Sequence, residues 1–194
     1  MTAGWKGEKV RLVPLDKARH FENVLHWANT PELTHWLLMG DLPLGRAAEE
    51  EWFDRMSRGT DTDVVFAIET LSGEHIGSSG LHRVDVRQGV AYTGTIIGRP
   101  EFWGQGYGGD AMRLRTWWAF EVYGLRMLLS EVHAENDASI RGLKRAGYKE
   151  CGVMPRRTWK RGEYRDVVIL VCDRDEWRKL PAGPYAGLNR PAAK

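Results

Sequence analysis

One short segment of the sequence has the composition of a ligand-binding loop, and it runs from Trp103 to Gly109. Four of its seven residues are glycines, which let the backbone approach a ligand closely. The segment follows a predicted strand and precedes a predicted helix. Free N–H groups at a helix start form an anion site, and the helix dipole strengthens it. A pyrophosphate is the ligand that this arrangement predicts.

Two other interpretations of the same segment stay open. Gly104, Gly106 and Gly109 fit the dinucleotide fingerprint G-x-G-x-x-G, and Glu131 lies near the position expected of an acid that binds the ribose. Against this, residues 99–103 separate the glycines from the preceding strand, several strands come first, and the chain ends in a predicted hairpin. The last interpretation is a glycine-rich turn that binds no ligand.

Strands and helices alternate around this loop. Strands first, followed by a strand-helix-strand-helix-strand run, predict a mixed α/β sheet in one domain. A hairpin is predicted from 148–159 and 164–172, across a four-residue turn at 160–163. The other strands are expected at 10–15, 64–69, 74–84, 90–98 and 127–133, and the helices after Asp16 and at about 30–36, 46–58, 108–123 and 137–146.

The composition excludes several classes of protein. A length of 194 residues suits one domain with a sizeable core, and a net charge of +2 gives no reason to expect nucleic acid as a partner. No apolar run is long enough to span a membrane and no apolar signal segment opens the sequence, so a cytoplasmic protein is expected. The six histidines and two cysteines lack metal-site spacing, so no metal is expected. A homodimer is left open.

Two stretches of the sequence resemble the motifs of one enzyme superfamily. Residues 94–111, with the form Trp-Gly-x-Gly-Tyr-Gly, resemble the acetyl-CoA motif of the GNAT N-acetyltransferases. Residues 136–148 resemble the second motif, and 161–168 resemble the ending of one branch. That branch contains the ribosomal-protein N-terminal acetyltransferases, the polyamine acetyltransferases and some aminoglycoside acetyltransferases. The similarity implies a single GNAT-like domain over 7–180 and leaves 181–194 as a flexible tail.

The resemblance implies how acetyl-CoA, the acetyl donor, is held. It implies a mixed, mostly antiparallel sheet, flanked by helices, that splays at the cofactor strand. Freed backbone groups of Ile96, Ile97 and Gly98 are then expected to bind the pantetheine arm like an added strand. Main-chain N–H groups are expected to cradle the pyrophosphate. They belong to Gln105, Gly106, Tyr107, Gly108 and Gly109.

The second motif contributes a helix beside the cofactor. The resemblance places Asn136 at the pantetheine or acetyl end and Arg141 near the phosphates or the adenine, whereas a simple helix cap is the other role open to Asn136. Many family members carry a tyrosine seven residues after this asparagine, suited to protonating the departing thiolate, and here that residue is Leu143. Ser139 is the nearest replacement, and the substitution Leu143→Tyr is expected to be tolerated.

Acetyl transfer to an amine requires a group that takes the amine proton, because a free amine has a pKa of roughly 8 to 10. Glu131 and His133 are the candidates, since residues two apart share one face of a strand. Each also fits the role of a satisfied sheet residue. The N–H of Ile97 or Gly98 is the candidate donor to the carbonyl oxygen.

The acceptor is expected between residues 29–41 and the hairpin segment 156–163, where His35, Trp36 and Trp52 are candidate wall residues. Aromatic residues at helical spacing are also typical of a core. The hairpin carries four basic residues that are expected either to be solvated or to meet an acidic or phosphate-bearing partner. They are Arg156, Arg157, Lys160 and Arg161.

The predicted function is transfer of acetyl from acetyl-CoA to a primary amine, by direct attack of the amine on the thioester. Both a protein N-terminus and a small-molecule amine fit as acceptor, and a tryptophan-rich, apolar rim favours the peptide. A non-catalytic acyl-CoA-binding module, motivated by Leu143, is one alternative. A dinucleotide-dependent oxidoreductase is the other.

Overall fold

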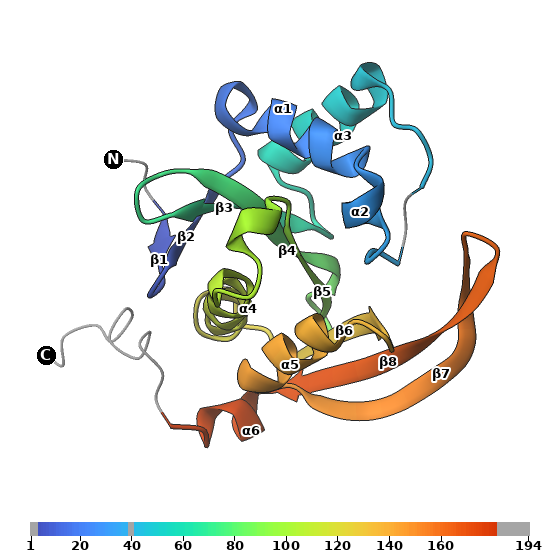
Figure 1. Ribbon diagram of the computed structural model, residues 1–194. Coiled ribbons are helices and arrows are strands. Elements are labelled where there is room, and N and C mark those ends of the chain that lie inside the picture. Colours follow the sequence, from blue (N-terminus) through green and yellow to red (C-terminus); the bar gives the residue numbers. More distant parts are fainter. Residues whose placement is uncertain (1–3, 39–40, 182–194) are drawn as a thin grey trace, which may run out of the picture.

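The computed structural model describes residues 4–38 and 41–181, and its centre is one eight-stranded sheet (Figure 1). The strand order is β1-β2-β3-β4-β5-β6-β8-β7, and only β5 and β6 run parallel to each other. The predicted mixed, mostly antiparallel sheet is therefore confirmed. The strands are β1 (Trp5–Lys6), β2 (Val10–Pro14), β3 (Val64–Thr70), β4 (His75–Asp85), β5 (Val90–Ile97), β6 (Met127–His133), β7 (Lys149–Lys160) and β8 (Glu163–Asp173).

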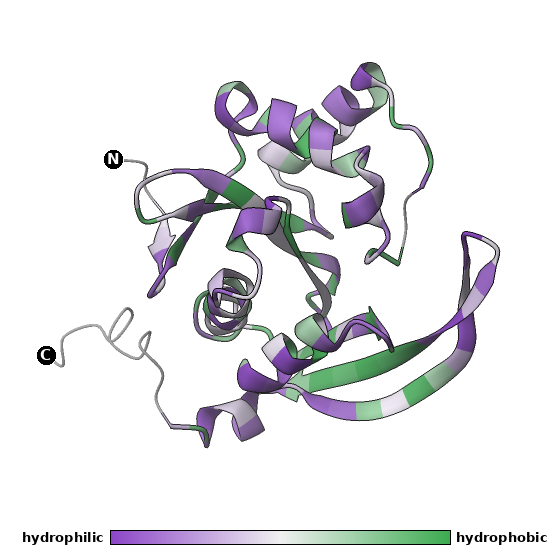
Figure 2. Cartoon of the chain, viewed as in Figure 1, coloured by the Kyte–Doolittle hydropathy of each residue, from purple (hydrophilic) through white to green (hydrophobic). Residues whose placement is uncertain are grey.

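Helices cover both faces of the sheet and enclose two hydrophobic clusters. On one face, α4, η2 and α5 pack over the larger cluster, which includes Leu81, Leu128 and Leu143. On the opposite face, α1, α2 and α3 pack over the smaller cluster around Phe53, and their outward surfaces are largely hydrophilic (Figure 2). The helices are α1 (Lys17–Ala28), α2 (Pro31–Thr34), α3 (Arg46–Arg58), η1 (Pro100–Phe102), α4 (Tyr107–Trp117), the π-helical η2 (Trp118–Val122), α5 (Asp137–Arg145) and α6 (Arg174–Arg178).

Local sequence signals set several element boundaries as expected. The Asp16 carboxylate accepts a hydrogen bond from the Arg19 N–H and so caps α1. The predicted helix at 46–58 and strand at 127–133 have the expected bounds. The hairpin turn differs, because only Arg161 and Gly162 form it, with φ of 53° and 81°. Positive φ at both central residues is typical of a type I′ turn, which matches the twist of two long strands.

Two further differences concern the ends of elements. The predicted helix at 108–123 begins at Tyr107 and changes from α to π geometry at Trp118. Residues 182–194, nearly all of the predicted tail, lie outside the described residues.

Across 4–38 and 41–181, no helix is long and apolar enough to cross a membrane, and no three His, Cys, Asp or Glu side chains gather as a metal site would require.

Candidate active site

The glycine-rich segment forms a turn that leads directly into α4. Gly104 and Gly106 have φ of 72° and 88°, a region that glycine adopts without strain. The first intrahelical hydrogen bond joins the Asp110 N–H to the Gly106 carbonyl at 3.0 Å. The N–H groups of Tyr107, Gly108 and Gly109 precede that bond, so the helix itself does not use them. Such N–H groups at a helix start are available to an anion, as the predicted site requires.

The glycines of this turn have open space beside them. A Cβ atom added to Gly104 or Gly109 would meet no atom within 4 Å, and one on Gly106 would meet only the Lys9 side chain, at 3.8 Å. Lys9 brings a positive charge to the loop, because its Nζ donates to the Gln105 carbonyl at 3.0 Å. Sequence reasoning missed Lys9, because this residue lies 96 positions before Gln105 in the chain and only the fold brings the two together.

A buried carboxylate fixes the start of α4 against the sheet. Asp110 is fully buried, and its Oδ2 accepts from the Lys9 N–H at 2.8 Å and the Val10 N–H at 3.1 Å. Arg113 also donates to Asp110, at 3.2 Å. Charge-assisted bonds of this kind are stronger than neutral ones. These hydrogen bonds hold the start of α4, and with it the glycine-rich turn, against the start of β2.

The sheet opens beside this loop, as the resemblance implied. β5 and β6 pair only from Val90–Met127 to Tyr92–Leu129. At the last step, two side chains bridge the strands: Thr93 Oγ1 donates to the Leu129 carbonyl at 3.1 Å, and Ser130 donates back to the Thr93 carbonyl at 3.4 Å. Beyond this point no further β5–β6 ladder pair forms within the described residues. We call this opening the fork.

The backbone N–H groups of the predicted cofactor residues at the end of β5 do not all point toward the fork. The Gly98 N–H donates to the Ile76 carbonyl at 2.9 Å, so it points into the sheet and not into the fork. Successive N–H groups of a strand point to opposite edges, so the Ile97 N–H points toward the fork. The Ile97 carbonyl already accepts from the Trp103 indole at 2.8 Å. Of the two candidate donors to a thioester carbonyl, Ile97 has the suitable direction.

Helix α5 begins close to the fork, and its side chains divide into cap, cofactor-facing and core groups. The Asn136 Oδ1 accepts from the Ser139 N–H at 3.1 Å, so the expected cap is formed, while the amide nitrogen makes no hydrogen bond within 4–38 and 41–181. The half-buried Ser139 hydroxyl makes no bond to its own helix. Arg141 is exposed and lies 3.7 Å from Asp137.

Leu143 does not face the cofactor side of α5. Its side chain is 2% exposed and packs in the larger hydrophobic cluster, next to Ile140. This burial argues against the expectation that Leu143→Tyr is tolerated, because a larger, polar side chain would have to enter a packed core. The sequence carried a signal for this, because Ile140 and Leu143 are three residues apart and share the apolar face of α5.

The two predicted proton acceptors on β6 lie in different surroundings. Glu131 is half-buried on the face away from α4, and its carboxylate has no hydrogen-bond or ion-pair partner in the described parts of the chain. His133 is completely buried, and its Nε2 lies 3.2 Å from the Thr158 hydroxyl. Burial lowers the pKa of His133 and so favours the neutral imidazole. Glu131 is accessible to a substrate, whereas His133 is enclosed.

A second pair of titratable groups, missed by sequence reasoning, lies on the same face. The His82 Nδ1 is 3.0 Å from the Asp63 carboxylate. Although burial acts in the opposite direction, hydrogen bonds from Thr62 and His82 hold the pKa of the Asp63 carboxyl below its usual value. Nothing in the local sequence pairs residues 19 positions apart, so only the β3–β4 register reveals the pair.

A family model for the acetyltransferase (GNAT) domain matches residues 9–149. The chain belongs to the GNAT acetyltransferase family. Its fold is similar to the spermidine N-acetyltransferase from Vibrio cholerae in complex with CoA and spermine (18% identity, TM-score 0.80, 88% of this chain and 98% of that chain). It is also similar to a GCN5-related N-acetyltransferase from Brucella melitensis (27% identity, TM-score 0.72, 92% and 81%). The family uses acetyl-CoA as its acetyl donor.

Membership of this N-acetyltransferase family removes the dinucleotide interpretation of the loop. The short η1 separates β5 from the glycines, and β5 pairs antiparallel with β4 on its other edge. A dinucleotide fold instead places its glycines directly after a central strand of a parallel sheet. The resemblance to the ribosomal-protein branch stays a prediction.

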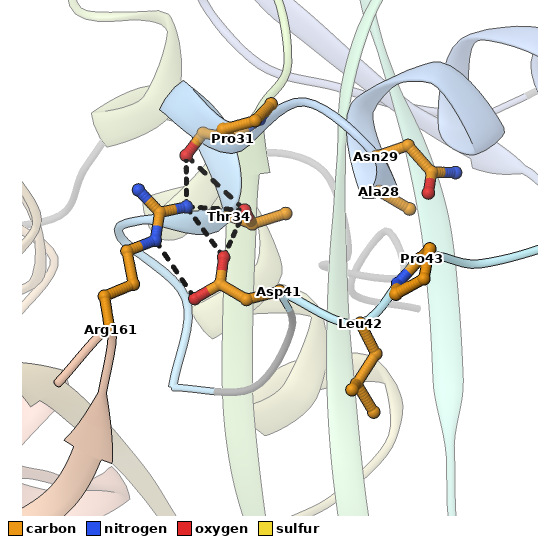
Figure 3. Close-up of a pocket in the computed structure, with 8 residues that line it drawn as sticks. All are labelled: Ala28, Asn29, Pro31, Thr34, Asp41, Leu42, Pro43 and Arg161. Atoms are coloured by element: carbon orange, nitrogen blue, oxygen red, sulfur yellow. Dashed lines mark hydrogen bonds and ion pairs between the residues drawn. The ribbon is translucent and has the colours of Figure 1, made fainter.

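The β7–β8 hairpin reaches up to the segment after α1 (Figure 1). Lys160 is buried, and its Nζ donates to the carbonyls of Thr34 and Leu37 at 2.6 and 2.7 Å. Arg161 donates to Asp41 at 2.7 Å and to the Pro31 carbonyl at 2.8 Å (Figure 3). The prediction of a solvated tip is wrong for Lys160, which is buried, whereas Arg161 is exposed and pairs with Asp41.

These contacts form a clamp, which we define as Lys160 and Arg161 with their acceptors on 31–41. The two expected acceptor walls do meet there, beside a cavity of about 380 Å³. Figure 3 shows that Arg161, Thr34 and Asp41 point toward one another at the rim of this cavity. Hydrogen bonds from Arg161, against a smaller opposing effect of burial, hold the pKa of Asp41 well below its usual range. The cavity lies at the clamp and not at the fork.

The predicted wall residues lie next to the clamp. Arg165 is buried, forms an ion pair with Glu135 at 3.0 Å and lies 3.5 Å from the His35 ring. Burial and then the Arg165 charge lower the pKa of His35. Trp36 is 37% exposed and meets the His35 ring edge-to-face at 4.7 Å. Trp52 instead packs against the smaller hydrophobic cluster.

Proposed function

We propose that this chain binds acetyl-CoA and transfers its acetyl group to a primary amine by direct attack of the amine on the thioester. The observation that supports this most is the fork beside a loop with unused N–H groups. A strand edge without a partner can bind an extended, amide-containing arm, and a helix start can bind its diphosphate. One ligand with both parts is a CoA thioester.

The donor is assigned to backbone groups of two elements. Ile96, Ile97 and Gly98 would form the strand along which the pantetheine lies, with the Ile97 N–H available to the thioester carbonyl oxygen. The loop 105–109 would hold the pyrophosphate, with the nearby charge of Lys9 favouring it. Asn136 and Arg141, at the first two turns of α5, are assigned to the pantetheine end and to the phosphate or adenine end.

Proton movements are assigned to side chains on both sides of the fork. Ser139 is the proposed proton donor to the departing thiolate, since its hydroxyl is not engaged by its own helix. Glu131 either holds the cationic amine or takes its proton, and His133 is too enclosed to meet the amine directly. Holding both substrates in one geometry supplies a large part of the acceleration in reactions of this type.

The acceptor wall favours an amine that is not a polycation. The clamp and its surroundings present Lys160, Arg161 and Arg165, whose charges are only partly offset by Asp41 and Glu135. A polyamine such as the spermine bound by the Vibrio cholerae enzyme would need an acidic wall. We therefore propose a peptide N-terminus, lying against His35 and Trp36, over a polyamine.

Calorimetry with acetyl-CoA and with NAD tests the donor. We expect acetyl-CoA to bind and NAD not to bind, and the reverse result would reject the proposal. Thiol release from acetyl-CoA with tripeptide amides, spermidine and an aminoglycoside then tests catalysis, with mass spectrometry of the products. Binding without thiol release from any amine would leave an acyl-CoA-binding module as the better description.

A further inference from the structure

His82 lies on the face of the sheet that α4 does not cover, at the level of the fork. Its neighbour Ser79 points to the other face, where the buried Arg115 lies 3.4 Å from its hydroxyl. Residues three apart in a strand point to opposite faces, so His82 points away from α4. In register, His82 pairs with Tyr92, and Tyr92 pairs with Leu129. These three side chains therefore lie in one row across β4, β5 and β6.

The next row on this face has no side chain at its centre. It consists of the paired glycines Gly80 and Gly94, and the β6 residue that follows Leu129 on the same face is Glu131. The His82 ring leans over the two glycines: its Nε2 lies 3.2 Å from where a Cβ of Gly80 would be, and 3.4 Å from that of Gly94. The imidazole of His82 thus lies over the backbone of the two glycines, on the same face of the sheet as the carboxylate of Glu131.

The His82 ring is held in one tautomer by its partner. An ionised carboxylate only accepts hydrogen bonds, so the contact with Asp63 requires a proton on His82 Nδ1. Asp63 is itself fixed, because Thr62 Oγ1 donates to its other oxygen at 2.7 Å and Thr60 Oγ1 accepts from its N–H at 2.8 Å. The Nε2 lone pair is left without a partner in 4–38 and 41–181, directed over the two glycines.

We propose that His82 Nε2 takes the proton of the acceptor amine, that Asp63 positions the ring, and that Glu131 holds the cationic amine from the β6 side of the fork. This rests on the proposed acetyl transfer. The ammonium N–H bond breaks as the proton moves to Nε2, and the nitrogen lone pair forms the new C–N bond. As the C–S bond breaks, the nitrogen gives up its second proton to solvent, the thiolate is protonated from Ser139, and the imidazolium proton replenishes Ser139 through solvent.

The charged groups around His82 fit this role. Asp63 is the nearest, and the positive charge of Arg55 on α3 acts on Asp63 from the helix layer. On the sheet, the Arg83 guanidinium lies 5.1 Å from the centre of the Tyr92 ring. His82 keeps 41% of its side chain exposed, so an entering amine can reach Nε2 without movement of a core element. A buried histidine such as His133 lacks that access.

The decisive variant is His82→Asn, because the asparagine amide can still donate to Asp63 but has no atom at the Nε2 position. We expect a normal fold, unchanged acetyl-CoA affinity by calorimetry and a fall in turnover of at least about 100-fold, the usual range for loss of a general base. Added imidazole should restore part of this turnover, since the site is open to solvent. The matched control is His26→Asn, on the exposed face of α1, with turnover unchanged.

Glu131→Gln distinguishes the two roles open to the Glu131 carboxylate, which are to hold the cationic amine or to take its proton. We expect it to raise the KM for the amine about tenfold with little change in turnover, as loss of uniform binding does. If instead Glu131→Gln lowers turnover about 100-fold while His82→Asn keeps normal turnover, the proposal is overturned and Glu131 is the base. That result would leave the acetyltransferase assignment intact.

A measurement without turnover tests His82 even if no amine is acetylated. Nitrogen-15 NMR of the histidine rings, at a pH where they are neutral, should show His82 protonated at Nδ1 and bare at Nε2. Adding a tripeptide amide together with CoA should shift this Nε2 signal, and Asp63→Asn should weaken the tautomer preference. The proposal is overturned if the His82 ring is protonated at Nε2. It is also overturned if the Nε2 signal does not move at a saturating concentration of a peptide whose binding calorimetry has shown.

Discussion

The two ends of the active site are built from different parts of the chain. The proposed donor end consists mainly of main-chain N–H groups on one continuous stretch, from Thr95 to Gly109, with a few side chains beside it. The acceptor end consists of side chains from four separate stretches, carried by the segment after α1, β4, β6 and the β7–β8 hairpin. Its working atoms are imidazoles, carboxylates and cations held by long-range contacts.

This difference decides how each end tolerates change. A backbone-built site is sensitive to the conformation that a residue can adopt, and hardly to the chemistry of its side chain. A site built from side chains is sensitive to which atoms remain and to what they touch. Substitutions at the two ends should therefore fail in different ways, and the predictions below follow from that contrast.

The largest effect is expected for Gly106→Val at the donor end. Gly106 has φ of 88°, which a β-branched residue adopts only with strain, and the added methyl groups would lie in front of the N–H groups of Tyr107 and Gly108. We expect acetyl-CoA affinity to fall at least about 100-fold, a loss equal to about 2.7 kcal/mol. Calorimetry on a variant shown by circular dichroism to be folded measures this.

Gly152→Val is the control for that substitution. Gly152 lies on the exposed strand β7, has ordinary backbone angles and no atom within 4 Å of an added Cβ. The same change of residue type should leave acetyl-CoA affinity within about twofold of the wild type. Equal losses at Gly106 and Gly152 would break the contrast, because they would show that β-branching acts through general stability.

The same contrast explains what could be predicted from the sequence. The glycine-rich turn before α4, the cap at Asp16 and the helix at 46–58 depend on neighbours in the chain, and the structure confirms these elements. The His82–Asp63 pair, Lys9 beside the loop and the Lys160 clamp join residues 19, 96 and 126 positions apart. Their contacts depend on strand register and on where a hairpin ends, which local patterns do not determine.

Leu143→Tyr tests a position where burial argues against the expected tolerance. The leucine is 2% exposed in the core under α5, so a tyrosine must displace its neighbours and leave its hydroxyl without a partner. We expect the free energy of unfolding to fall by about 2 kcal/mol, measured by urea titration, with no gain in turnover. Leu143→Met, which conserves volume, is the control and should cost less than about 1.5 kcal/mol.

Ser139→Ala probes the one proposed donor-end side chain that would act on the departing sulfur. An interaction that strengthens as sulfur gains charge acts on the transition state and not on bound acetyl-CoA. We therefore expect turnover to fall about tenfold with acetyl-CoA affinity unchanged, because a thiolate leaves readily and needs modest help. Wild-type turnover would mean that water protonates the sulfur, and equal losses of affinity and turnover would mean that Ser139 contacts the ground state.

The smallest effect is expected from Asp41→Asn in the clamp. Asp41 is 25% exposed, and its pKa is lowered mainly by hydrogen bonding from Arg161, against the opposing effect of burial. A carboxyl whose pKa is lower in the folded than in the unfolded chain stabilises the fold above its unfolded value of about 3.9, and this contribution is lost as the pH falls. At pH 7 the variant should melt about 2–4 °C below the wild type.

The pH dependence of that difference distinguishes the ion pair from simple packing. As the pH falls below about 4, the wild type takes up a proton on unfolding that the variant cannot take up, so the two melting temperatures should converge. Asp61→Asn, at an exposed aspartate without a partner in the described chain, should show no difference at any pH.

Acetyl-CoA affinity should stay unchanged in both variants, because the clamp lies at the acceptor end. A loss of acetyl-CoA binding in Asp41→Asn would show that the two ends are coupled and would break the contrast between them.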